Sequence, residues 1–71
     1  MNGHELHIGE MIRQELKLQR RSVAWLALQL HCNRSNAYKI LERKDVDTDL
    51  LRRVSHALNC DFFLRISQVG F

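Results

Sequence analysis

The 71-residue sequence lacks any apolar run of the roughly 18 residues that a membrane-spanning helix requires. Its first residues, MNGHELH, also lack the basic segment leading into an apolar one that marks a signal peptide. We therefore expect a cytoplasmic protein with no membrane partner. A chain of this length is expected to form one domain, whose core is too small to enclose an enzyme pocket comfortably.

Glycine and cysteine are both scarce, and each scarcity argues against a class of site. The three glycines are widely separated, at positions 3, 9 and 70, so no glycine-rich loop is present to cradle a phosphate. The two cysteines, Cys32 and Cys60, each occur within an apolar pattern. That placement favours buried free thiols in a reducing compartment over a disulfide, although the sequence leaves a disulfide open.

Histidine and cysteine positions give little support for a metal centre or a catalytic pair. His4 and His7 are three residues apart, but no cysteine or third histidine lies near them in the sequence to complete a metal site. His31 and His56 could be paired with the cysteines on paper, yet isolated Cys and His in helical core patterns are far more often packing residues. We therefore predict no metal, no cofactor and no enzymatic activity.

Basic residues are unevenly distributed along the chain. Residues 13–44 contain eight Lys or Arg against Glu15 and Glu42, a net charge of +6, whereas the remaining residues sum to −3. A concentration of positive charge is typical of a surface that binds nucleic acid. Solvated helix surfaces are also rich in Lys and Arg, so charge alone leaves both interpretations open.

The apolar periodicity within residues 21–44 predicts two short helices joined by a tight turn. Apolar residues recur at helical spacing over residues 23–30, and a second apolar face follows over residues 37–41. The intervening residues 31–33 are too few for a loop and too polar for a continued helix. Two short helices across such a turn form a helix-turn-helix.

A family resemblance is carried by Leu26, Ala27, Leu30, Cys32, Arg34, Ser35, Ala37 and Ile40, followed by LLRRVSHALNCDF from Leu50 to Phe62. In these residues the chain resembles the lambda-repressor/Cro-like helix-turn-helix family, often labelled XRE, and residues 8–62 follow the pattern without gaps. The resemblance implies a compact all-α domain of four to five helices that binds double-stranded DNA. The chain departs from the pattern at His31, where glycine is usual. A positive φ is expected there, which costs a non-glycine residue roughly 1 kcal/mol, and His is among the residues enriched in that region.

Local signals define the helices around this motif. Residues 8–18 should form a helix with a buried stripe of Ile8, Met11, Ile12 and Leu16 and with the charged Glu15 at its margin. Ser22 and Asn33 are good N-cap residues for the two helices of the motif, and Asp47 or Thr48 is one for the next. That next helix should bury Leu51, Val54, Ala57 and Leu58 and end at Asn59 in a left-handed conformation. Trp25 and Leu28 lie off the main stripe and are expected to extend the core.

We predict that residues 34–41 enter the major groove of DNA. With Ala37, Ile40 and Leu41 buried, the exposed side chains that we expect to read bases are Arg34, Ser35, Asn36, Tyr38 and Lys39. Arg bonds bidentately to guanine, and Asn does so to adenine. For Asn36 a local capping role stays open, and for Tyr38 packing against the preceding helix stays open.

Phosphate contacts are predicted at the two ends of the motif, by Arg20, Arg21, Ser22, Arg43 and Lys44. The first three precede a helix N-terminus, whose unpaired amides attract anions. Simple capping beside solvated arginines is the alternative. Arg43 and Lys44 follow a helix C-terminus, where they also suit the negative end of the helix dipole. The acidic connector of residues 45–49 should face away from the phosphates.

The last segment, residues 62–71, allows two interpretations. A fifth short helix follows the family pattern, whereas the alternation of Phe62, Leu64 and Ile66 predicts a strand. A lone strand would pair with its copy in a second chain, forming a homodimer through Phe62, Phe63, Leu64 and Ile66. The two recognition helices would then lie about one DNA turn, roughly 34 Å, apart.

We predict a sequence-specific DNA-binding transcriptional regulator that acts as a repressor. The expected organisation is a disordered N-terminus over residues 1–7, a helix-turn-helix domain over 8–61 and an apolar segment over 62–71. The alternative is a protein-interaction module, such as an antitoxin or adaptor, with weak or no DNA binding. Its protein partner would bind the apolar tail and the region around Trp25.

Overall fold

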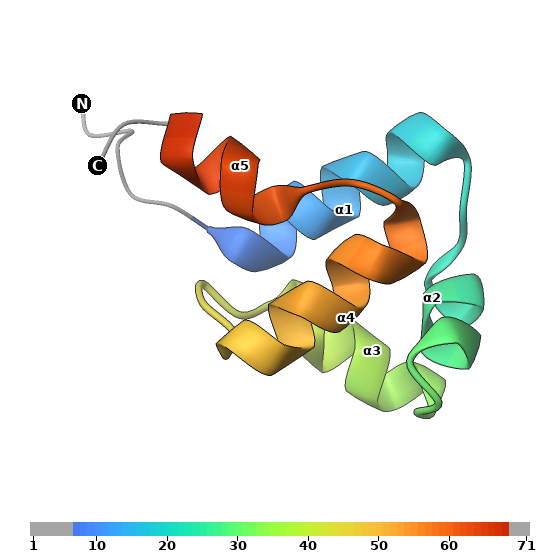
Figure 1. The fold of residues 1–71 in the computed structure, drawn as a ribbon. Coiled ribbons are helices and arrows are strands. Elements are labelled where there is room, and N and C mark those ends of the chain that lie inside the picture. Colours follow the sequence, from blue (N-terminus) through green and yellow to red (C-terminus); the bar gives the residue numbers. More distant parts are fainter. Residues whose placement is uncertain (1–6, 69–71) are drawn as a thin grey trace.

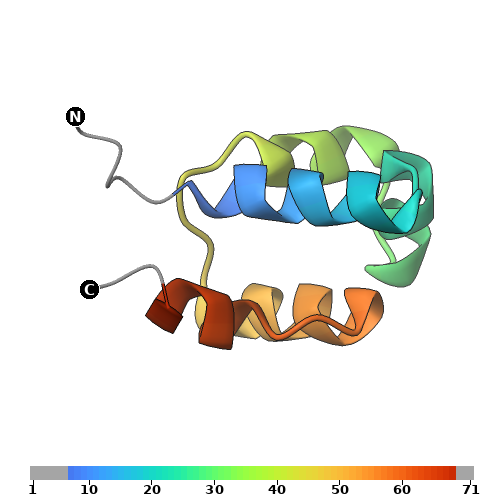
Figure 2. The same cartoon turned by 90° about the horizontal axis from the view of Figure 1, so that it is seen from above.

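The computed structural model describes residues 7–68, which form five helices. They are α1 (Ile8–Gln19), α2 (Val23–Gln29), α3 (Arg34–Leu41), α4 (Thr48–Leu58) and α5 (Phe62–Gln68). Figures 1 and 2 show α1 and α3 side by side in one layer, α4 and α5 in a second, and α2 at one end of the molecule. The predicted compact all-α architecture is confirmed over these residues.

Of the two interpretations of the C-terminal segment, the fifth helix is confirmed as α5, and the strand is wrong. Asp61 begins the helix by accepting the Leu64 backbone N–H on its carboxylate at 3.0 Å. Phe62 is fully buried, and Ile66 packs at the margin of the same core. These two residues are four apart and share one face of a helix, whereas Leu64 points outward. The pattern therefore has helical period, and residues 69–71 of the predicted segment lie outside the described residues.

Side-chain caps begin the helices where the sequence predicts them. Ser22, Asn33 and Asp47 each accept the backbone N–H three residues further on, at 3.0, 2.8 and 2.7 Å respectively. Each cap pairs one of the amides that a helix N-terminus leaves without a partner. His7, which we assigned to the N-terminal segment, similarly caps α1 by accepting the Glu10 N–H on its Nδ1 at 3.0 Å. Residues 1–6 of that segment lie outside the described residues.

Three helices end at a non-glycine residue with positive φ. These are Arg20 at 58°, His31 at 57° and Asn59 at 52°. At each, the residue's own N–H bonds to the carbonyl three positions earlier, and the following N–H bonds to the carbonyl five positions earlier. This is the Schellman pattern, which pairs carbonyls that the end of a helix would leave open. The predicted left-handed conformations of His31 and Asn59 are confirmed. The left-handed conformation of Arg20 was not predicted.

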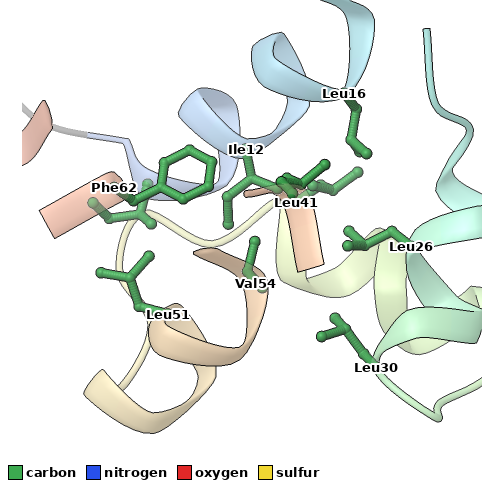
Figure 3. Packing of buried hydrophobic residues seen from close by; sticks show 10 residues of the cluster. Ile12, Leu16, Leu26, Leu30, Leu41, Leu51, Val54 and Phe62 are labelled. Atoms are coloured by element: carbon green, nitrogen blue, oxygen red, sulfur yellow. The ribbon is translucent and has the colours of Figure 1, made fainter. Parts of the chain in front are cut away.

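The core receives side chains from all five helices (Figure 3). Its buried members are Ile8, Ile12, Leu16, Leu26, Leu30, Leu41, Leu51, Val54, Leu58 and Phe62. Trp25 packs against this cluster as predicted, but Leu28 is 74% exposed and the prediction for it is wrong. Leu28 lies two residues, or about 200°, around α2 from the buried Leu26, and no element covers that side. Cys32 and Cys60 are half-buried free thiols.

Glu15 is buried rather than marginal, with 8% of its surface exposed. Its two carboxylate oxygens accept from Arg65 of α5 at 2.5 Å and from Gln19 at 2.7 Å. Gln19 also donates to the Leu58 carbonyl of α4 at 2.7 Å. The hydrogen bond from Gln19 and the ion pair with Arg65 lower the pKa of Glu15 in spite of its burial, which acts in the opposite direction. This cluster ties α1 to both helices of the second layer.

Candidate nucleic-acid interface

Helices α2 and α3, for which we predict a helix-turn-helix, pack against each other, and Leu26, Leu30 and Ala37 of this segment are buried. Asn33 fixes where α3 begins, and the left-handed His31 fixes the direction in which the chain leaves α2. Arg53 of α4 donates from Nη2 to the Leu30 carbonyl at 2.8 Å. The turn is therefore held from within the motif and from the second layer.

All five predicted base-reading residues of α3 are exposed: Arg34, Ser35, Asn36, Tyr38 and Lys39. Ala37 and Leu41 are buried against the rest of the domain, and Ile40 is half-buried. Asn33 rather than Asn36 supplies the capping oxygen, and the Tyr38 ring is not buried against α2. The structure thus brings these five side chains to the surface of one short helix.

The predicted phosphate-binding residues at the start of α2 are also exposed. Arg20 occupies the left-handed position after α1, and the Ser22 hydroxyl accepts the Trp25 N–H. The Arg21 guanidinium lies over the Trp25 ring, 4.5 Å from its centroid. This cation–π contact fixes a long side chain beside a helix N-terminus. The spacing of four residues between Arg21 and Trp25 was the signal for it in the sequence.

Four cations of this region have no carboxylate partner among the described residues. Among residues 7–68, Arg20, Arg34, Lys39 and Arg43 form no ion pair. Two of the three acidic side chains of the connector are engaged elsewhere, since Asp47 caps α4 and Asp49 pairs with Arg52 at 2.8 Å. The positive charge that residues 13–44 concentrate is therefore largely uncompensated at this surface, which attracts polyanions.

A groove of about 320 Å³ runs between α3 and α4. Its polar lining consists of Asn36, Lys39, Arg43 and Arg53, and its apolar lining consists of Leu30, Cys32, Ile40 and Leu50. Sequence reasoning did not assign Arg53 to this surface. The adjacent Arg52 and Arg53 were the only signal, and nothing local places either of them beside α3.

The C-terminal end of α3 is held by the first turn of α1. The Ile8 N–H donates to the Lys44 carbonyl at 2.7 Å, and the Gly9 N–H donates to the Arg43 carbonyl at 2.9 Å. A Cβ atom at Gly9 would lie 2.6 Å from the carbonyl carbon of Leu41 and 2.7 Å from the Arg43 oxygen. Only glycine permits this approach, which positions Arg43 and Lys44. A lone glycine in a helical pattern was its signal in the sequence.

The residues predicted for dimerisation do not share one surface. Phe62 is buried in the core, and Ile66 packs at its margin. Phe63 and Leu64 remain 41% and 55% exposed. Only these last two present large apolar surface to a partner.

Other kinds of site find no support in the part of the chain that the structure describes. There, no three His, Cys, Asp or Glu side chains are gathered where they could bind a metal. No helix within residues 7–68 combines the length and apolar character that crossing a bilayer requires.

Comparisons with protein-family models, with curated proteins and with solved structures found no match to this chain. The likeness to lambda-repressor-like domains therefore depends on the residues quoted for it and stays a prediction.

Proposed function

We propose that this chain is a sequence-specific DNA-binding transcriptional regulator of the lambda-repressor-like kind, in which α3 reads the major groove. One observation carries the proposal. The exposed surface of α3 presents hydrogen-bonding side chains, and its cations have no carboxylate partner among the described residues. Further cations lie beyond both ends of that surface, at the start of α2 and after α3.

Base reading is assigned to the first turns of α3. Arg34 suits the O6 and N7 atoms of guanine, and Asn36 suits the N6 and N7 atoms of adenine. Ser35, Tyr38 and Lys39 extend the contact to neighbouring base edges or phosphates. The Asn33 cap supports this assignment because it sets the residue at which the helix starts and thus the direction of Arg34 to Asn36.

Phosphate anchoring is assigned to Arg20, Arg21, Ser22, Arg43 and Lys44. The contact of Arg21 with Trp25 reduces the conformational entropy that the arginine would lose on binding. Phosphate contacts release counterions, so affinity should fall steeply as salt rises. These contacts orient the domain without selecting a sequence.

A homodimer that represses by occlusion completes the proposal. Two copies related by a two-fold axis would place two α3 helices on successive major grooves of a palindromic site. The exposed Phe63 and Leu64 on α5 are the surface that we assign to this contact. Occlusion requires only that the bound dimer cover a promoter.

Selection from a random duplex pool tests the proposal. We expect enrichment of a palindrome or of two half-sites, with affinity for the selected duplex falling steeply with salt. The spacing of the half-sites would report the dimer. An unenriched pool, with weak binding that vanishes near physiological salt, would contradict the proposal.

The second candidate is a protein-interaction module. The observation that favours it is the exposure of large apolar side chains, with Leu28 of α2 and Leu18 of α1 each 74% exposed. Exposed apolar surface often marks a protein contact. The same selection separates the candidates, because an interaction module predicts no sequence enrichment.

A further inference from the structure

A second hollow, of about 470 Å³, lies between the α2–α3 turn and α4. It is lined by Gln29, His31, Arg52, Arg53, His56 and Ala57. Its volume falls within the range of about 300–1,000 Å³ that is common for small-molecule sites. None of these side chains is a carboxylate. The function proposed above does not use Arg52, His56 or His31.

The lining is rich in groups that donate hydrogen bonds. Two guanidiniums, two imidazoles and one amide surround the hollow. Arg53 is held in place by its bond from Nη2 to the Leu30 carbonyl at 2.8 Å. A guanidinium carries five N–H donors, so this single bond leaves others to meet a ligand. Arg53 therefore places one guanidinium in a fixed position at the edge of the hollow.

Arg52 is already paired with Asp49 of the same helix, at 2.8 Å. Both side chains are largely in water, at 75% and 64% exposed. An exposed pair of this kind is weak, because water and salt screen it. Arg52 can therefore turn toward a more highly charged ligand at little cost.

We propose that this hollow binds a small anion that carries phosphate groups. Arginine meets the planar array of phosphate oxygens bidentately, and clustered cations favour a ligand with more than one negative charge. The hollow is separate from the groove beside α3, with Arg53 as the one residue that lines both. This separation favours a free phosphate compound over the DNA backbone as the source of the phosphate.

The position of Arg53 gives such a site a consequence for the rest of the domain. The same side chain donates to the carbonyl of Leu30, directly after α2, and lines the groove beside α3. A bound phosphate would therefore interact with Arg53, which links α4 to the turn before α3. An effect of the bound anion on DNA binding rests on the proposed function, whereas the anion site itself does not.

Titration of the protein with sodium pyrophosphate, followed by backbone amide NMR at constant ionic strength, tests the site without DNA. We expect saturable shifts at the amides of His31, Arg52 and His56. Arg52→Gln and His56→Gln should each weaken binding on the order of tenfold, as loss of a charged hydrogen-bond donor does. Both positions are exposed, and the melting temperature of each variant verifies that it folds.

Arg13→Gln is the matched control, because Arg13 pairs with Glu10 three residues earlier on α1 as Arg52 pairs with Asp49 on α4. It should leave pyrophosphate binding unchanged. Unsaturable shifts spread over all basic residues, or an equal loss in Arg13→Gln, would overturn the proposal. It is also overturned if Arg52→Gln weakens binding of duplex DNA but not of pyrophosphate, since the hollow would then serve the DNA backbone. Pyrophosphate binding by a chain that binds no DNA would support the site and remove only the proposed function.

Discussion

The arginines of two regions of the molecule, α1, α4 and α5 on one side and the α2–α3 segment on the other, are partnered differently. In α1, α4 and α5, Arg13, Arg52 and Arg65 each pair with a carboxylate, at 3.5, 2.8 and 2.5 Å. Around α2 and α3, no such pair is formed by Arg20, Arg34, Lys39 or Arg43 within residues 7–68. Unpaired cations held close together repel one another and add nothing to stability. The difference leaves the cations around α2 and α3 available to a polyanion.

A few contacts join different helices of the molecule, and whether a mutation affects stability or binding depends on whether it removes one of these contacts. Gly9 brings α1 against the end of α3, Arg53 links α4 to the α2–α3 turn, and Glu15 joins α1 to α5. Changes at these joints should alter stability. Changes on the exposed α3 surface should alter binding alone.

The largest effect is expected for Gly9→Ala. The added methyl group would overlap backbone atoms of Leu41 and Arg43, which cannot move aside as a flexible side chain can. We expect a loss of about 3 kcal/mol in the free energy of unfolding, at the upper end for overpacking. Urea denaturation measures it. Gln14→Ala, at an exposed position of the same helix, should change stability by less than about 0.5 kcal/mol, and an equal loss there would contradict the explanation.

Arg34→Ala should separate specific from non-specific binding. We expect it to weaken binding to the selected duplex by about 1–3 kcal/mol and to relax the preference at one base pair. Arg21→Ala should instead weaken binding to all duplexes alike, because we assign Arg21 to a phosphate contact. Neither change should shift the melting temperature by much, since both side chains are exposed. Equal effects of both variants on selected and random DNA would refute the assignment of roles.

Glu15→Gln should reveal the contribution of the buried carboxylate. The substitution removes the charge that pairs with Arg65, and we expect a loss of about 1–2 kcal/mol, reduced by the partial exposure of the arginine. Because the pKa of Glu15 is lowered in the folded protein, its stabilisation is present above the ordinary pKa and is lost as the pH falls below it.

The pH dependence gives this prediction an internal control. Urea denaturation of the wild type should show a decline toward acidic pH that is shallower in Glu15→Gln. Glu10→Gln removes the carboxylate of an exposed pair on the same helix and should leave the slope nearly unchanged. A Glu15→Gln slope identical to that of the wild type would show that the buried pair contributes no pH dependence.

The smallest effect is a gain in stability, expected for His31→Gly. Glycine relieves the strain of the left-handed position, roughly 1 kcal/mol, but increases the freedom of the unfolded chain, so the net gain should be at most about 0.5 kcal/mol. Thermal denaturation measures it. Asn59→Gly is the comparison. Because asparagine tolerates the left-handed conformation better than histidine, this substitution should increase stability by less. A loss of stability in His31→Gly would mean that the imidazole makes contacts that outweigh the strain.

Local signals in the sequence were enough to predict most of the helices. The caps at Ser22, Asn33 and Asp47 and the left-handed end at Asn59 each depend on a few consecutive residues, whereas the positive φ of His31 was expected from the family resemblance. The exposed side chains of α3 followed from the same helical periodicity. Short-range chemistry decides these features, so no knowledge of the packing was needed.

The features that the sequence missed depend on contacts between distant segments. The burial of Glu15 depends on its ion pair with Arg65, which lies fifty residues further along the chain. Arg53 donates to the carbonyl of Leu30, twenty-three residues earlier in the chain. The C-terminal segment was ambiguous because Phe62, Leu64 and Ile66 also fit a strand, and only the core contact of Phe62 selects the helix. The lone glycine at position 9 signals a close approach, but nothing in the local sequence identifies the end of α3 as the segment that it contacts.

The most direct test of the difference between the two regions is amide NMR of the protein titrated with the selected duplex. We expect the largest shifts at the start of α2 and along α3, from Arg20 to Ser22 and from Arg34 to Lys39. Amides of Arg13 and Arg65, whose side chains are paired, should move little. Shifts concentrated on α5, with α3 unaffected, would contradict the claim that the unpaired cations form the DNA-binding surface.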